Sequence, residues 1–133
     1  MLLIITLFSA TLHAESITEH CKSAADSKAV FSGTLTKRTY PGRPNYESIE
    51  NGDEAELVYV LRLLNKTCIM FEGHSSEYID EVQVINHRVD ISGFLSQDVS
   101  LHGESFEAHT GHHHTRVILS LSALPETFKS TSQ

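Results

Sequence analysis

The stretch "DVSLHGESFEAHTGHHHTRVILSLSAL", residues 98–124, decides which fold we expect for this chain. Two β-rich runs, residues 98–109 and 115–124, flank a short polar turn, which is the pattern of a β-hairpin. Gly103 interrupts the first run, and a glycine inside a strand marks a bulge or tight coiling of the sheet. A small closed sheet needs such glycines at its corners. The stretch therefore predicts the closing hairpin of a small, strongly coiled sheet.

The residues before this hairpin predict further strands and one long loop. "CKSAADSKAVFSGTLTKRTY", residues 21–40, leads into a strand that Gly33 interrupts. Residues 41–56 hold two prolines, two glycines and an Asn-Gly-Asp turn signal, so they predict a long structured loop. Residues 88–97 predict a turn or two of helix. The remaining strands are expected at "LVYVLRLL", "CIMFEG" and "EVQVINH", with a turn at "NKT" between the first two.

This order of elements predicts an all-β fold. Five to six short strands, with a short helix or turn before the last two, are the layout of a small OB-like barrel. A β-sandwich is the competing fold, but it usually needs about seven strands. The chain has 133 residues, which is the length of one domain. We place that OB-like domain at residues 15–124, followed by a polar C-terminal tail at residues 125–133.

The N-terminus predicts export from the cell. Residues 1–14, "MLLIITLFSATLHA", are apolar with small residues near the end, which is typical of a signal peptide. An N-terminal strand or a membrane anchor is the alternative, but the run is too short to span a bilayer as a helix. We therefore expect a periplasmic or secreted protein, with no transmembrane span once the signal is removed.

The two cysteines, Cys21 and Cys68, fit an oxidising compartment. An even pair in an exported domain predicts one disulfide, which would stabilise the fold by about 4 kcal/mol on the chain-entropy model. Two free thiols are the alternative.

The charge of the chain argues against nucleic acid as a partner. The formal net charge is −7, and ten scattered basic residues are outnumbered by seventeen acidic ones. Phosphate backbones require clustered Lys and Arg. The acidic balance is compatible with a cationic ligand or a metal.

The histidine-rich turn allows three interpretations. His112 and His114 point to one face of an extended strand, and Gly111 is free to take a positive φ, so His109 can approach them from the other arm. Neutral imidazoles suit zinc, copper or nickel, so these three side chains would form the core of a site for such an ion. On this geometry His113 would point away from the site. The fourth ligand would come from Glu107, Glu47 or Asp53. A turn that hydrogen-bonds the other loop, or a pH-responsive patch, explains the same residues.

Two quoted motifs resemble a known bacterial family. "YPGRPNYESI", residues 40–49, and "AHTGHHHT", residues 108–115, are similar to the domain of unknown function 4431, over about residues 21–124. The resemblance implies an exported bacterial protein with a cysteine pair at matching places. It implies no activity, because the family has none assigned.

Both motifs fall on loops where an OB-like fold holds its ligands, namely the loop between strands 1 and 2 and the loop between strands 4 and 5. We therefore predict a non-enzymatic binding module with its ligand between residues 41–53 and 109–114. The alternatives are a metal-binding protein or minor metal-dependent hydrolase, and a structural envelope protein whose loops pack on each other. The partner would be a small ligand, a metal or an envelope protein, and neither a catalytic residue nor a certain cofactor is predicted. The candidate ligand-binding residues are Tyr40, Pro44, Asn45, Tyr46, Glu47, His109, Thr110, His112 and His114.

Overall fold

The computed structural model of the protein describes residues 20–86 and 88–129. The predicted signal peptide, residues 1–14, and the last residues of the predicted tail, 130–133, lie outside the described residues. Within the described ranges, no helix is long and apolar enough to cross a membrane.

The described part of the chain forms one sheet of seven strands and one short 3-10 helix. Two strands are long, and together they form a hairpin: β2 (Asp26–Pro41) and β3 (Ala55–Met70). The shorter elements are β1 (Lys22–Ser23), β4 (Ser76–Ile85), η1 (Ser92–Phe94), β5 (Asp98–Glu107), β6 (Val117–Leu121) and β7 (Glu126–Thr127).

Five of these strands close into a ring of pairings. Around the ring, β2 pairs with β3, β3 with β4, β4 with β6, β6 with β5, and β5 with β2. The β4–β6 pairing is parallel and the others are antiparallel. This confirms the prediction of an all-β, OB-like fold, and η1 is the short helix or turn expected before the last two strands. The predicted tail is not wholly irregular, because β7 pairs with β5.

One predicted turn is wrong. "NKT", residues 65–67, was expected to separate two strands, but β3 runs through it without a break. The pairing of β3 with β4 shifts register between Arg62 and Thr67, and residues 64–66 are exposed. The polar residues therefore mark an exposed irregularity within one long strand, which increases local twist, rather than a reversal of the chain.

The two interior glycines lie where neighbouring backbones come very close. A Cβ built on Gly33 would lie 2.0 Å from the carbonyl oxygen of Arg62, and one on Gly103 would lie 2.0 Å from that of Ser120. No larger residue fits at such a separation. Both glycines therefore permit the tight coiling that closes the ring.

The ring encloses an apolar core that holds the strands together. Side chains with no exposed surface come from each of its strands, among them Leu35, Leu61, Val82, Leu101 and Leu119. The predicted disulfide is confirmed: Cys21 is bonded to Cys68, which attaches the chain before β1 to the far end of β3.

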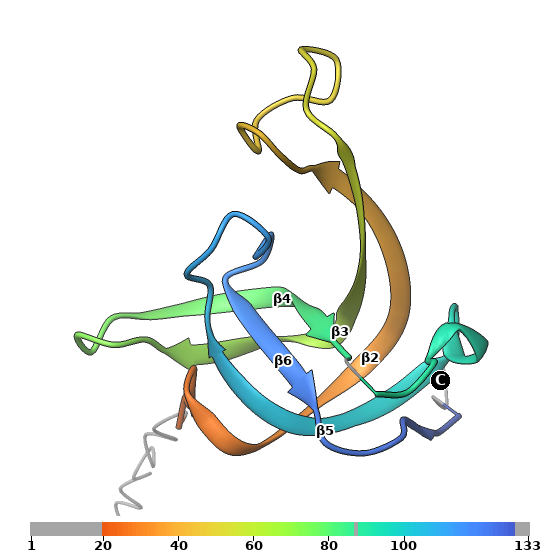
Figure 1. Cartoon of the computed structure of the whole chain (residues 1–133). Helices are drawn as coiled ribbons and strands as arrows, with labels where there is room; N and C mark the ends of the chain where they lie inside the picture. The colour runs from red at the N-terminus through yellow and green to blue at the C-terminus, as the bar shows by residue number, and fades with distance from the viewer. Residues whose placement is uncertain (1–19, 87, 130–133) are drawn as a thin grey trace, which may run out of the picture.

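The outer half of the β2–β3 hairpin extends beyond the ring. Residues 36–41 of β2 pair with β3 alone, because the pairing of β2 with β5 ends at Thr34 and the last backbone bonds on that side join Leu35 to Ser96 and Gln97. Figure 1 shows this part of the hairpin curving over the open end of the ring, toward the loop between β5 and β6. We call residues 35–58 the arch and residues 108–116 the histidine loop.

Candidate functional site

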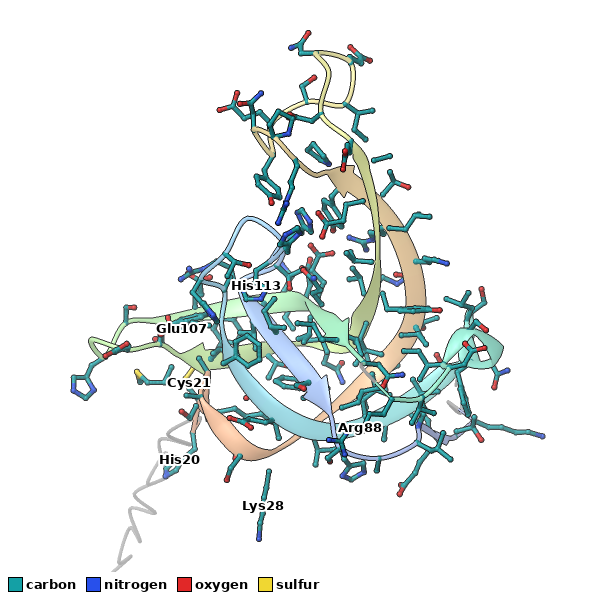
Figure 2. All side chains as sticks on the ribbon, viewed as in Figure 1. His20, Cys21, Lys28, Arg88, Glu107 and His113 are labelled. Atoms are coloured by element: carbon teal, nitrogen blue, oxygen red, sulfur yellow. A yellow bond between two sulfur atoms is a disulfide. The ribbon has the colours of Figure 1, made fainter. Side chains whose placement is uncertain are left out.

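The arch and the histidine loop meet at one rim of the molecule. The Tyr46 hydroxyl lies 3.2 Å from Nε2 of His112, although the two residues are 66 positions apart in the chain. In Figure 2, side chains from the underside of the arch and from the loop that carries His113 fill the space between these segments. The predicted juxtaposition of the two motifs is therefore present in the structure.

The tip of the arch is folded around the carboxylate of Asp53. This side chain is buried and accepts hydrogen bonds from the backbone N–H groups of Ser48, Glu47 and Asn45, at 2.9, 2.8 and 2.9 Å. These bonds, from Ser48 first and then from Glu47 and Asn45, hold the pKa of Asp53 below its ordinary value. Asp53 therefore organises the loop, and it is not free to serve as the fourth metal ligand that the sequence suggested.

Tyr46 packs directly on Gly111. Tyr46 has a φ of 57°, a conformation that is uncommon for a residue with a side chain. A Cβ built on Gly111 would lie 2.7 Å from a carbon of the Tyr46 ring. The predicted role of Gly111 is therefore wrong: it does not have a positive φ, and it provides room for the tyrosine ring instead.

The base of the histidine loop is held by Gln83 of β4, a residue that the sequence analysis did not select. Its side-chain NH₂ donates to the carbonyl of His112 at 2.9 Å, and its side-chain oxygen accepts the N–H of His114 at 2.6 Å. Its backbone N–H donates to the Thr115 hydroxyl at 2.8 Å. A glutamine between two valines in a strand reads as solvent-facing, but this one is buried, because the loop folds back over it.

Glu56 brings two of the histidines together from across the sheet. Nδ1 of His112 lies 2.9 Å from Glu56 Oε1, so the imidazole donates to the carboxylate there. Nε2 of His114 lies 3.6 Å from Glu56 Oε2, and its ring stacks on Tyr40 with centroids 4.4 Å apart and planes 6° apart. Tyr40, His112 and His114 were predicted site residues, whereas Glu56 was read only as the end of a loop.

The other two histidines of the loop form a separate cluster. Nδ1 of His113 accepts the backbone N–H groups of His109 and Thr110 at 3.0 and 3.3 Å, so this nitrogen carries no proton. Burial, and then the neighbouring His109, His112 and His114, lower the pKa of His113. His113 was expected to point away from any site, but it forms the internal support of the loop.

The three predicted metal ligands are not gathered at one point. The His109 ring packs against His113 and Phe106, with centroids 4.7 and 5.5 Å away, while His112 and His114 face Glu56. Among residues 20–86 and 88–129, no group of three or more His, Cys, Asp or Glu side chains is arranged to hold a metal ion. Of the other predicted residues, Asn45, Glu47 and Thr110 contribute backbone N–H groups, and Pro44 follows a cis peptide bond in the arch.

A pocket of about 440 Å³ opens between the two segments. It is within the size range of small-molecule sites. The arch supplies most of its lining, and His112 is the lining residue from the histidine loop; the arch residues are Gly42, Arg43, Glu54, Ala55 and Glu56.

A comparison with models of known protein families finds a match for one segment of the chain. Residues 81–124 match the family model of DUF4431, a domain of unknown function. The resemblance stated from the sequence is thereby confirmed for this segment. The DUF4431 segment contains the second half of β4, the whole of β5 and β6, and the histidine loop, whereas the arch precedes it. No curated protein and no solved structure matches the chain.

Proposed function

We propose that the protein is a non-enzymatic binding module whose ligand lies between residues 41–53 of the arch and residues 109–114 of the histidine loop. The observation that carries the proposal is the pocket of about 440 Å³, because residues from both segments line it. The two segments correspond to the loops that OB-folds use for their ligands, which supports the proposal.

The hydrogen bonds that hold the arch and the histidine loop in place favour a binding role. Asp53 fixes the tip of the arch, and Gln83 fixes the base of the histidine loop, so the walls of the pocket are ordered before a ligand arrives. A pre-organised site avoids the cost of ordering its loops on binding.

We propose further that the protein is exported and works in the periplasm or outside the cell. The apolar residues 1–14 and the bond between Cys21 and Cys68 support this location. Cell fractionation, with mass analysis of the recovered protein, tests it: we expect a chain that begins near Glu15 with no reactive thiol. Recovery of the full-length chain with two alkylatable cysteines would contradict it.

A thermal-shift screen across metal salts, glycans and envelope peptides tests the binding role. Ala55 is exposed on the pocket wall, so Ala55→Phe fills the pocket, while Ala25→Phe is a matched change at an exposed site elsewhere. We expect at least one ligand to raise the Tm of the wild type and of Ala25→Phe but not that of Ala55→Phe. If no ligand class does so, or if all three proteins respond equally, the pocket is not the binding site.

A structural role is the second candidate, and the packing of Tyr46 on Gly111 is the observation that favours it. In that case the two segments lock each other and need no ligand. The double variant Tyr46→Ala, His112→Ala distinguishes the roles: a loss of several degrees of Tm without any ligand effect on the wild type supports locking. A small loss, together with lost ligand binding, supports the binding module.

A further inference from the structure

Glu56 is a carboxylate without a permanent counter-charge. Arg38 is paired with Glu81, and Arg116 is paired with Glu77 at 2.7 Å. Glu56, by contrast, has only imidazoles as ion-pair partners among the residues that the structure describes. Its side chain is 23% exposed and reaches the pocket wall.

His114 supplies a second, independent sign of a missing partner. Its side chain is 9% exposed, and its Nε2 is a buried atom with no hydrogen-bond partner in the described part of the chain. The stack on Tyr40 fixes the orientation of the ring. Buried polar atoms are nearly always hydrogen-bonded, so an orphaned nitrogen aimed at Glu56 calls for an explanation.

One group can satisfy both atoms. Nε2 of His114 and Oε2 of Glu56 are 3.6 Å apart, too far for a hydrogen bond between them. A nitrogen that carries two N–H bonds can lie beside this pair, within hydrogen-bond distance of each atom, and donate to both, since a carboxylate accepts and so does the imidazole nitrogen that carries no proton. A positive charge on that nitrogen would also compensate Glu56.

We propose that the pocket beside Glu56 binds a cationic nitrogen group, a primary ammonium such as that of a lysine side chain or of a small amine. This rests on the proposed function and names the ligand class of the same site. Glu56 and Glu54 on the pocket wall supply the charge. His114 does not line the pocket itself, but its Nε2 lies 3.6 Å from Glu56 Oε2, where it supplies the second acceptor. Arg43 is the one fixed cation on that wall, so the two glutamates leave it net negative.

In the structure, the Nδ1–H group of His112 already donates to the Glu56 carboxylate that the ammonium would contact. Its Nδ1 donates to Glu56 at 2.9 and 3.1 Å, so an arriving ammonium competes with this N–H group for the carboxylate. The His112 side chain is 49% exposed, which gives it room to rotate outward. An ammonium carries a full charge and three N–H donors, so it can replace this contact and also reach a second acceptor.

Titration of the full mature chain, followed by NMR, tests the proposal. The probes are N-acetyl-lysine methylamide, its norleucine analogue, in which a methyl group replaces the ammonium, and a lysine-bearing peptide against butylamine. We expect saturable shifts at the amides of Ala55, Glu56 and His112 with the lysine probe and none with the norleucine probe. The peptide and butylamine arms then show whether the ammonium is recognised alone or within a chain.

Two variants with one control assign the contacts. Glu56→Gln keeps the size of the side chain and removes its charge, and it should weaken binding by at least about tenfold. His114→Phe keeps an aromatic ring against Tyr40 and removes Nε2, and it should weaken binding several-fold. Glu104→Gln, at an exposed position of β5 outside both segments, should leave binding unchanged.

The possible outcomes distinguish a failure of the ammonium site from a failure of the proposed binding module. Equal binding of the norleucine probe, or unchanged binding by a folded Glu56→Gln protein, overturns the ammonium site. If a neutral or anionic ligand instead binds the pocket and Ala55→Phe abolishes that binding, the binding module stands and its ligand class is wrong. If no probe of any class binds there, both proposals fail.

Discussion

The substitution Gly111→Ala tests the contact between the two loops with a single methyl group. A Cβ at this position would lie 2.7, 2.8 and 2.8 Å from three carbons of the Tyr46 ring. Carbon atoms prefer separations of about 3.5–4.0 Å, so the ring must retreat by roughly 1 Å. That movement lengthens the 3.2 Å contact between the Tyr46 hydroxyl and His112 beyond hydrogen-bond range and disturbs their edge-to-face ring contact.

The loss of stability can be worked out from the contacts that the Tyr46 side chain loses. One hydrogen bond contributes about 0.5–1.5 kcal/mol and one aromatic pair about 0.5–1.5 kcal/mol, and Tyr46 is only partly buried, so it can move. We expect Gly111→Ala to lower the free energy of unfolding by about 1–2 kcal/mol, near the lower end of the range for overpacking.

Chemical denaturation with the disulfide intact measures this change, and Gly93→Ala is the matched control. A Cβ on Gly93 meets no atom within 4 Å, so the change there should stay within about 0.5 kcal/mol. The decisive comparison is Gly111→Ala in the Tyr46→Ala background, where the obstructing ring is gone and the penalty should fall close to zero. An equal penalty with and without the Tyr46 ring would refute the packing argument.

Four further predictions concern the fold and the supports of the rim. Gly33→Ala places a Cβ against a backbone oxygen at 2.0 Å, so the ring should fail to close, and the soluble yield and cooperative unfolding of the protein should be lost. The double variant Cys21→Ala, Cys68→Ala removes a cross-link over 47 residues and should lower the free energy of unfolding by about 4 kcal/mol; a loss under about 1 kcal/mol in denaturant titration would contradict this. Gln83→Leu leaves the carbonyl of His112 and the N–H of His114 without their partner, at a cost of about 2–4 kcal/mol, and faster hydrogen exchange at His114 should accompany it. The pKa of His113 is lowered in the fold, so its stabilising contribution is complete above its ordinary value of 6.5 and is lost as the pH falls below it. The protection of the His109 and Thr110 amides from hydrogen exchange, taken relative to the intrinsic rate at each pH, should fall in that range, and a His113→Asn protein should not show the step.

The fold could be predicted largely because its signals are local. The spacing of β-rich runs, the two interior glycines and the cysteine pair gave the all-β, OB-like arrangement and the disulfide. The "NKT" turn was wrong because polar residues in a strand and polar residues in a turn look alike in sequence. Only the pairing of β3 with β4 shows that the strand continues.

The site was predicted only in part, because its geometry depends on contacts across the sheet. The two loops meet as expected, and Tyr40, Tyr46, His112 and His114 lie at their junction. Glu56 and Gln83 were missed, since neither belongs to a motif and each acts through a partner more than twenty-five positions away.

The division of the histidines into two clusters was also beyond the sequence. Spacing alone shows which residues of an extended strand share a face, but the histidine loop is a compact turn. Within it the N–H groups of His109 and Thr110 turn inward onto His113. A pattern that assumes an extended strand therefore assigns His109 and His113 to the wrong sides.

The measurement that tests the rim most directly is a nuclear Overhauser experiment on the isotopically labelled protein at neutral pH. The structure predicts strong cross-peaks between the ring protons of Tyr46 and the α-protons of Gly111, because a Cβ at that glycine would touch the ring. It also predicts cross-peaks between the rings of Tyr40 and His114. If the tyrosine signals are assigned and neither set of cross-peaks is seen, the two loops do not share a rim, and the proposed ligand pocket does not exist.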